Sequence, residues 1–480
     1  MGSVCGDAGL SDLACESSLR PGGCADRHGL CAAMSEGTER RRIHQMSGLE
    51  QGGVAFACLL LLLAVGVPVG FALASVAAIG LYLSVGASFV LTTFKTTPYT
   101  LASDYTFVVV PMFVLMGAIA GRAGIIGDLY FAAQAVLSRV RGSLFMATII
   151  AQAGFAAASG STVVASGVFT RMALPEMLKF RYDPGVSAGC IAAAGTLAGL
   201  IPPSIAMVLY ALLTGEPVGA LLIAGILPGV LTAGAYMYGI RLFLIVRPEW
   251  APEVKETITG PMRFRALSKV WSVLLLMILV MGGIYSGLFP PSAAGAVGAA
   301  GALFIALSMR RIGGNKIWEA LLESARITAM IFLIVIGGLV FSRFLLISGF
   351  IGDIRAFVTA TELGVGGFLA MTVVLFLLLG MFLDSVSLLV IAVPFLYPIS
   401  QTLGIDPIWF AVIIVKLIEI AAISPPVGLN LYAVLASADG RVKTGQLFKG
   451  VLPFLAIEMV VLALLLAFPA IATFLPATMG

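Results

Sequence analysis

Charged residues are scarce in this chain. Only 11% of its 480 residues are Asp, Glu, Lys or Arg, whereas 60% are hydrophobic and the mean hydropathy is +1.07. A soluble domain averages about 25% charged residues, so the composition excludes an ordinary soluble domain. Several apolar runs approach or exceed the roughly 20 residues that cross a bilayer: Val54–Leu83, Leu221–Val246, Val270–Leu288 and Phe454–Phe474. The sequence predicts an all-α, multi-pass membrane protein.

A nucleotide-binding motif and a basic nucleic-acid-binding surface are also missing. No Gly-x-x-x-x-Gly-Lys-Ser/Thr phosphate loop occurs, and because that loop cradles nucleotide phosphates, we expect no ATPase activity in this chain. The net charge is only +4, and the 28 Lys and Arg residues lie mostly between apolar runs. This distribution is typical of topology signals and excludes a nucleic-acid surface.

Cysteine and histidine are rare outside the N-terminus, since only Cys58 and Cys190 lie in the apolar body. A zinc site near the N-terminus is disfavoured by irregular spacings, and the segment lacks the apolar region of a signal peptide. We interpret residues 1–50 as an N-terminal extension that does not fit the pattern of the rest of the chain. It is either disordered or the result of a wrongly assigned start codon, with Met46 as the alternative start. The other cysteines and both histidines lie there: Cys5, Cys15, Cys24, Cys31, His28 and His44.

Proline and aspartate landmarks repeat at a fixed offset of 223 residues. Two Ile-Gly-Asp triplets lie 225 residues apart, so a two-residue insertion or deletion separates the anchors. Agreement across several anchors predicts an internal duplication. The landmarks are Pro68, Pro175, Asp183-Pro184 and Pro202-Pro203, with partners Pro291, Pro398, Asp406-Pro407 and Pro425-Pro426.

The distribution of basic residues predicts that the two repeats are inverted. Six Lys and Arg residues crowd the loops between Arg122 and Arg181, whereas residues 361–407 of the second repeat contain none. Under the positive-inside rule, corresponding loops therefore lie on opposite faces of the membrane.

We expect five crossings and one re-entrant hairpin in each repeat. The predicted segments are repeat 1 at 51–246 (hairpin 143–178, broken helix 185–214), a cytoplasmic linker at 247–268, and repeat 2 at 269–475 (hairpin 366–400, broken helix 407–437).

Polar residues interrupt the centre of each predicted hairpin. The flanking apolar arms are shorter than a full span, as in a hairpin that reaches the membrane centre and returns. Hydroxyl and carboxylate oxygens there are ligands that a hard cation accepts, although a polar turn at the membrane surface is the alternative. The candidates are Ser159, Gly160, Ser161 and Thr162 in the first hairpin, and Gly380, Asp384 and Ser385 in the second.

Tandem prolines interrupt one helix in each repeat. Proline removes an amide donor and breaks a helix, and the freed backbone groups are useful only where they face an ion or a cavity. A simple kink is the alternative. The candidates are Pro202 and Pro203 with Gly195 and Thr196, and Pro425 and Pro426 with Ser424, Gly428 and Asn430.

Ionisable residues inside membrane spans are costly, so each is a functional candidate. Asp384 is the strongest of these. Lys416 and Glu419 lie three residues apart in one predicted span, where Glu419 could bind an ion or could simply neutralise Lys416. Arg326 and Arg343 lie near predicted span ends and could extend to the interface.

At these residues the chain resembles the large, DctM-like permease subunit of TRAP (tripartite ATP-independent periplasmic) transporters, over roughly residues 50–475. Together the shared motifs are specific, whereas IPPS or SPPVG alone would be weak. They are ASGSTVVASG (158–167), ALPEM (173–177), YDP (182–184), AGTLAGLIPPS (194–204), AGILPG (224–229), GMFLDS (380–385), GIDP (404–407) and EIAAISPPVGLN (419–430).

The resemblance implies a sodium-driven elevator in the bacterial inner membrane, which imports an organic acid such as a C4-dicarboxylate or sialic acid. It implies two partners, a small four-span membrane subunit that is not fused here and a periplasmic solute-binding protein. It implies that sodium is the coupling ion and binds at each hairpin tip and the adjacent helix break. It implies no other cofactor. Ser424 stands where the family usually has Thr, and Lys416 departs from the family pattern. The implied sodium ligands are Ser161, Thr162, Asp384, Ser385 and Ser424.

Two alternatives remain open. A dicarboxylate/sodium symporter shares hairpins and broken helices but needs no binding protein. An intramembrane aspartyl protease needs two facing aspartates, and Asp384 has neither a mid-membrane partner nor a flanking GxGD motif.

Overall fold

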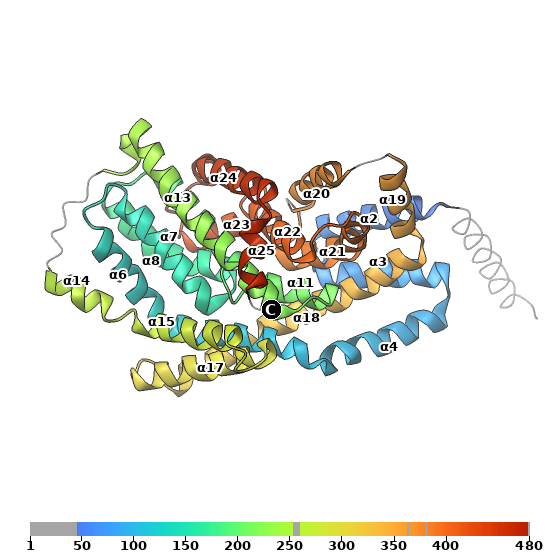
Figure 1. The fold of residues 1–480 in the computed structure, drawn as a ribbon, viewed down its shortest axis with the longest axis horizontal. Coiled ribbons are helices and arrows are strands. Elements are labelled where there is room, and N and C mark those ends of the chain that lie inside the picture. Colours follow the sequence, from blue (N-terminus) through green and yellow to red (C-terminus); the bar gives the residue numbers. More distant parts are fainter. Residues whose placement is uncertain (1–45, 253–259, 362–363, 381, 479–480) are drawn as a thin grey trace, which may run out of the picture.

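The computed structural model describes residues 46–252, 260–361, 364–380 and 382–478, and these residues form helices without any strand (Figure 1). Within them, seven helices are long and apolar enough to cross a membrane, or eight if the bent pair Pro184–Leu200 and Ile205–Thr214 counts as one span. The N-terminal cysteines and histidines, and part of the predicted linker, lie outside the described residues. The all-α membrane fold is confirmed.

The first half of the chain begins with an ordered helix. Ser47 caps α2 (Gly48–Ala64), and its hydroxyl and the Glu50 carboxylate accept reciprocal backbone hydrogen bonds. This capping box satisfies two amides of the first turn. The predicted boundary at residue 50 is therefore wrong, because it falls inside the first turn of α2.

The remaining elements of the first half run from α3 to α13. The first half continues with α3 (Val69–Ser84), α4 (Ala87–Ser103), η1 (Tyr105–Val108), α5 (Val109–Arg122), α6 (Ile125–Leu137), α7 (Ser143–Ser159), α8 (Thr162–Lys179), α9 (Pro184–Gly195), α10 (Leu197–Leu200), α11 (Ile205–Thr214), α12 (Val218–Ala224) and α13 (Ile226–Val246).

The second half follows the short turn η2 (Pro248–Trp250). It comprises α14 (Gly260–Leu267), α15 (Trp271–Met277), η3 (Ile278–Gly282), α16 (Gly283–Tyr285), α17 (Pro291–Ser308), α18 (Gly314–Ile347), α19 (Phe350–Ala360), α20 (Val365–Gly380), α21 (Ser385–Thr402), α22 (Pro407–Ala422), α23 (Leu429–Ser437), α24 (Thr444–Ala467) and α25 (Ala470–Ala477).

Equivalent residues start equivalent helices in the two halves. Asp183 caps α9 and Asp406 caps α22, and each carboxylate accepts the amide of the residue three positions later at 2.8 Å. In both cases proline follows at the first helical position, where its missing N–H costs nothing. α8 and α21 begin and end at residues separated by the same 223 positions.

Two helices, α18 and α4, differ from the sequence-based expectation. α18 spans 34 residues, a length of roughly 50 Å, which is longer than the roughly 20 residues of one predicted crossing. α4 was not predicted, because its threonine-rich sequence and Lys95 make it less apolar than a span. We call α3, α5, α17 and α18 the frame: α18 packs on α3 and α5, and α17 packs on α5 (Figure 1).

The hairpins and broken helices pack across the two halves. α8, the second arm of the first hairpin, packs on α23, and α21, the second arm of the second hairpin, packs on α11. We call α7–α11 and α20–α24 the hairpin body. Small residues allow this close approach: a Cβ on Gly167 would lie 3.3 Å from Ser437 Oγ.

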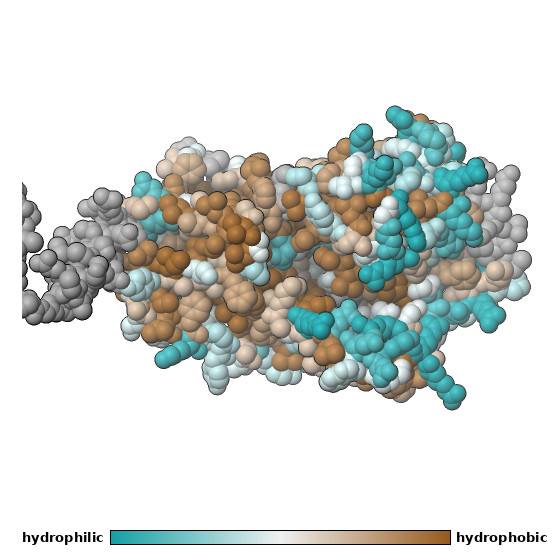
Figure 2. Space-filling model, turned by 180° about the vertical axis from the view of Figure 1, so that it is seen from behind, coloured by the Kyte–Doolittle hydropathy of each residue, from teal (hydrophilic) through white to brown (hydrophobic). Residues whose placement is uncertain are grey.

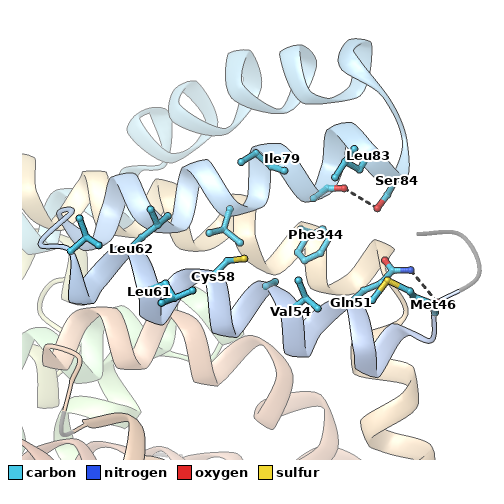
Figure 3. A pocket seen from close by; sticks show the side chains of 14 residues that line it. Met46, Gln51, Val54, Cys58, Leu61, Leu62, Ile79, Leu83, Ser84 and Phe344 are labelled. Carbon is cyan, nitrogen blue, oxygen red and sulfur yellow. Dashed lines mark hydrogen bonds between the residues drawn. The ribbon is translucent and has the colours of Figure 1, made fainter. Parts of the chain in front are cut away.

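The outer surface is largely apolar. Large side chains such as Val65, Phe71 and Ile79 are more than half exposed, as expected of residues that face lipid. In Figure 2 the brown apolar surface is broad, and hydrophilic side chains gather toward one end. An apolar groove lies between α2 and α3, lined by Cys58 and by Phe344 of α18 (Figure 3). It lies apart from the predicted polar sites.

Candidate functional site at the hairpin tips and helix breaks

The tip of the first hairpin lies against the first helix break. α7 ends at Ser159, and Gly160 turns the chain with a φ of +60°, which glycine adopts without steric cost. A Cβ on Gly160 would lie only 2.3 Å from the carbonyl oxygen of Pro203. The structure therefore brings these two predicted segments together, and only glycine permits the contact.

Hydroxyl groups near this tip are buried without partners. Ser159 Oγ and Ser166 Oγ have no hydrogen-bond partner among the described residues. A Cβ on Gly195 would lie 2.0 Å from Ser166 Oγ and 3.2 Å from the Thr162 carbonyl oxygen. Since buried polar atoms are normally hydrogen-bonded, these hydroxyl groups have unused hydrogen-bonding capacity. Ser166 lies within the motif ASGSTVVASG and was not among the predicted ligands.

Ser161 occupies the N-cap position of α8 but accepts no capping hydrogen bond. Together with Ser159 it lines a small cavity against α5, α11 and α18. Its hydroxyl is therefore available for another ligand.

The second hairpin tip is built differently, because Asp384 caps α21. Its carboxylate accepts the amides of Val386 at 3.1 Å and Ser387 at 3.2 Å, and also the Ser387 hydroxyl. Asp384 and Ser161 thus hold the equivalent N-cap positions in the two hairpins. The role of Asp384 as an ion ligand stays a prediction, and the structure adds a capping role.

The second tip also lies close to the second break. A Cβ on Gly380 would lie 2.2 Å from Ala421 Cβ, near the end of α22. Ser385 follows the cap as the first residue of α21 and is partly buried.

The second break contains a buried amide without partners. Ser424 donates its hydroxyl to the Ile420 carbonyl at 2.8 Å, and Gly428 turns the chain with a φ of +41°. Asn430 is fully buried, and neither its oxygen nor its nitrogen has a partner among the described residues. The Pro202-Pro203 and Pro425-Pro426 peptide bonds are both cis.

The predicted mutual neutralisation of Lys416 and Glu419 is wrong. Lys416 Nζ pairs with Glu458 of α24 and donates to Thr232 Oγ1 at 3.1 Å. The Lys416 and Glu458 side chains are fully buried. The reason is that α24 packs against α22 and presents a carboxylate directly to the ammonium group.

Glu458 joins this ion pair to the first break. Its Oε1 accepts a hydrogen bond from the Tyr236 hydroxyl and from Thr196 Oγ1 at 3.3 Å. Sequence reasoning missed Glu458, Tyr236 and Thr232. The lone acid within the apolar run of α24 was a usable signal, because an ionisable residue in a membrane span is expensive.

Glu419 lies apart from these hydrogen bonds. It is 1% exposed, and its Oε2 has no hydrogen-bond partner among the described residues. A Cβ on Gly199, in α10, would lie 1.9 Å from its Oε1. Glu419 therefore contacts the backbone of the first break from the opposite half of the chain.

The two arginines of α18 are exposed and lie outside this cluster. Arg326 and Arg343 are both exposed in the described structure, which agrees with the hypothesis that they extend to the membrane interface. In the described part of the chain, no group of three or more His, Cys, Asp or Glu residues could hold a metal ion. The candidate ligands are hydroxyl, amide and carbonyl oxygens, which suit hard cations.

Comparison with known proteins identifies the family. Residues 56–471 match the family described as "Tripartite ATP-independent periplasmic transporter, DctM component". The C4-dicarboxylate TRAP transporter large permease protein DctM of Pseudomonas aeruginosa is 34% identical, over 79% of this chain and 88% of its own length. The sialic acid TRAP transporter large permease protein SiaM of Vibrio cholerae is 31% identical, over 88% of this chain and 98% of its own.

A more distant relative and a solved structure agree with this family. The ectoine TRAP transporter large permease protein TeaC of Halomonas elongata is 29% identical, over 88% of this chain and 98% of its own. The crystal structure of the Alcanivorax borkumensis YdaH transporter superposes with a TM-score of 0.57 at 16% identity, over 86% of this chain and 98% of that chain. This last similarity concerns the fold alone. The chain therefore belongs to the DctM-component family of TRAP transporters, as a large permease subunit that crosses the inner membrane several times.

Proposed function

We propose that this permease imports a small organic acid by sodium-coupled elevator motion, together with a small membrane subunit and a periplasmic binding protein. The observation that carries the proposal is the cross-packing of the hairpin body. Each hairpin's second arm packs on the broken helix of the other half. Such an arrangement can move as one unit while the hairpin tips and helix breaks stay in contact.

Sodium coupling is supported by the buried oxygen atoms near the first hairpin. Ser166 Oγ and the Thr162 carbonyl oxygen are hard ligands close to Gly195, and Ser159 Oγ is a further buried oxygen without a partner at the hairpin tip. In this proposal they would hold one sodium ion with Ser161, and Asp384, Ser385 and Ser424 would contribute at the second hairpin. A bound cation would satisfy buried oxygens that are otherwise unpaired.

The substrate is proposed only as an organic acid. Relatives of similar identity are named for C4-dicarboxylate, sialic acid and ectoine. Because such different solutes are associated with similar permeases, we propose that the binding protein selects the solute in this system. The permease would then supply the coupled pathway.

Uptake into proteoliposomes tests this function directly. The permease and its small subunit would be reconstituted, and uptake of a radiolabelled organic acid measured with and without purified binding protein, under an inward sodium gradient or a matched potassium gradient. We expect uptake only with both the binding protein and sodium. Rapid uptake of free substrate without the binding protein would instead favour an independent dicarboxylate/sodium symporter.

A further inference from the structure

The buried ionisable groups around α22 and α24 are unevenly paired. Lys416 pairs with Glu458, and Glu458 also accepts the Tyr236 and Thr196 hydroxyls. The Glu419 Oε2 atom has no hydrogen-bond partner among the described residues. The cluster therefore has one ammonium group, that of Lys416, and two carboxyl groups. The ammonium group and both hydroxyl donors interact with Glu458.

Burial makes this asymmetry costly if both carboxyl groups are ionised. Glu419 is 1% exposed, and Lys416 and Glu458 are fully buried. An isolated ionised carboxylate in a low-dielectric interior is strongly disfavoured, and such a group is neutralised instead. A neutral cluster results when Lys416 is charged, Glu458 is ionised and Glu419 is protonated.

The surroundings of Glu419 contain few other charges. The neighbouring helices α10, α12, α20 and α25 carry no ionisable residue in the described part of the chain. The other helices packed on α22 contribute Tyr210 (α11), Tyr397 (α21), Tyr432 (α23), Lys449 and Glu458 (both α24). Among the residues of these helices, the charged ones are Lys449, which is exposed, and the buried Glu458, and α22 itself adds Lys416.

The same geometry disfavours a metal cation at Glu419. The close backbone of Gly199 occupies the space beside its Oε1, and Lys416 lies one helical turn away on α22. A hard cation needs several oxygen ligands around it, whereas a proton needs one oxygen atom and almost no volume.

We infer that Glu419 is a proton-binding site of this permease, distinct from the proposed sodium ligands at the hairpin tips. Its contact with Gly199 joins the protonated carboxyl group to the first helix break across the two halves. Ionisation of Glu419 would leave an unpaired charge against that break, so a change in its protonation favours rearrangement there. The effect on uptake rests on the proposed transport function, whereas the protonation itself does not.

Infrared spectroscopy of the purified permease tests the protonation without any transport measurement. A protonated carboxyl group gives a C=O stretching band separate from the carboxylate bands. We expect such a band at neutral pH in the unmodified permease, its loss in Glu419→Gln, and its retention in Glu249→Gln, since Glu249 is an exposed glutamate with a side chain 59% accessible. Absence of the band, or its persistence in Glu419→Gln, would overturn the inference.

A conservative variant guards against misfolding. If Glu419→Gln does not fold, Glu419→Asp keeps an acid group and is expected to keep the band at a shifted frequency. An unshifted band in Glu419→Asp would show that another acid produces it.

Uptake as a function of pH tests the functional consequence. In the reconstituted system at a fixed sodium gradient, we expect the initial uptake rate of the unmodified permease to change severalfold as the pH rises and Glu419 ionises. The uptake rate of Glu419→Gln should not change with pH. An unchanged pH profile in Glu419→Gln would overturn the coupling role. Loss of sodium dependence in the unmodified permease would count only against the proposed function, because the infrared result is independent of sodium.

Discussion

Asp384 combines two properties that substitution can separate. Its carboxylate caps α21 through the amides of Val386 and Ser387, and its charge makes it the predicted sodium ligand of the second hairpin. Asparagine caps helices about as well as aspartate, whereas alanine does not. A change to asparagine therefore removes the charge and keeps the cap.

We predict that Asp384→Asn and Asp384→Ala both lower sodium-dependent uptake at least tenfold, a loss of about 1.4 kcal/mol. Only Asp384→Ala is expected to lower stability as well, by about 1 kcal/mol. Uptake assays and thermal unfolding of the detergent-solubilised permease measure the two effects. Normal sodium dependence in Asp384→Asn would mean that Asp384 is a helix cap and not an ion ligand.

A side chain at Gly199 is predicted to lower the stability of the permease. A Cβ there would lie 1.9 Å from Glu419 Oε1, so Gly199→Ala should destabilise the permease by about 1–3 kcal/mol through overpacking. Gly234→Ala is the matched control, because nothing lies within 4 Å of its Cβ position on α13. The control should be neutral or stabilising by up to about 1 kcal/mol. Equal thermal stability of the two variants would contradict the close contact.

The sequence predicted some of these residues and missed others for a physical reason. Ser159 and Gly160 were identified because polar residues interrupt strongly apolar runs, and Asn430 because it follows the tandem prolines that interrupt a helix. Both signals are local. Glu458 and Tyr236 were missed because their importance comes from Lys416, on a helix distant in the sequence. Pairing across helices is a property of packing, and one sequence does not reveal it.

At the scale of helices, the offset of 223 residues holds for the bounds of α8 and α21. The helix starts marked by Asp-Pro were predictable because capping depends on neighbouring residues in the sequence. The length of α18 and the existence of α4 were not, since both helices are only partly apolar. α18 packs on α3 and α5, and α4 packs on α3 and α18. Such contacts support partly apolar helices, and the hydropathy pattern does not contain them.

The contact between α8 and α23 gives a prediction at this scale. Gly167→Cys with Ser437→Cys, in a background without the six native cysteines, should form a disulfide, because a Gly167 Cβ lies 3.3 Å from the Ser437 hydroxyl position. Both helices belong to the hairpin body, so uptake should stay within about twofold of the reduced protein, well under the 1.4 kcal/mol of a tenfold change. A gel-mobility shift measures the crosslink. Loss of uptake on oxidation would indicate movement within the hairpin body.

At the scale of the whole molecule, the proposed elevator requires the hairpin body to move against the frame. α21 of the body packs on α18 of the frame. A Cβ on Gly338 would lie 3.0 Å from the Val390 Cβ, slightly closer than the roughly 3.8 Å that is typical of a disulfide. A small shift would therefore allow a crosslink between the two parts, away from every proposed ion ligand.

The most direct test is sodium-driven uptake by Gly338→Cys with Val390→Cys, in the same cysteine-free background, before oxidation, after oxidation and after reduction. We predict that oxidation lowers uptake at least tenfold and that reduction restores it, whereas the Gly167→Cys with Ser437→Cys crosslink leaves uptake intact. Full uptake by permease that is completely crosslinked between α18 and α21 would contradict the elevator.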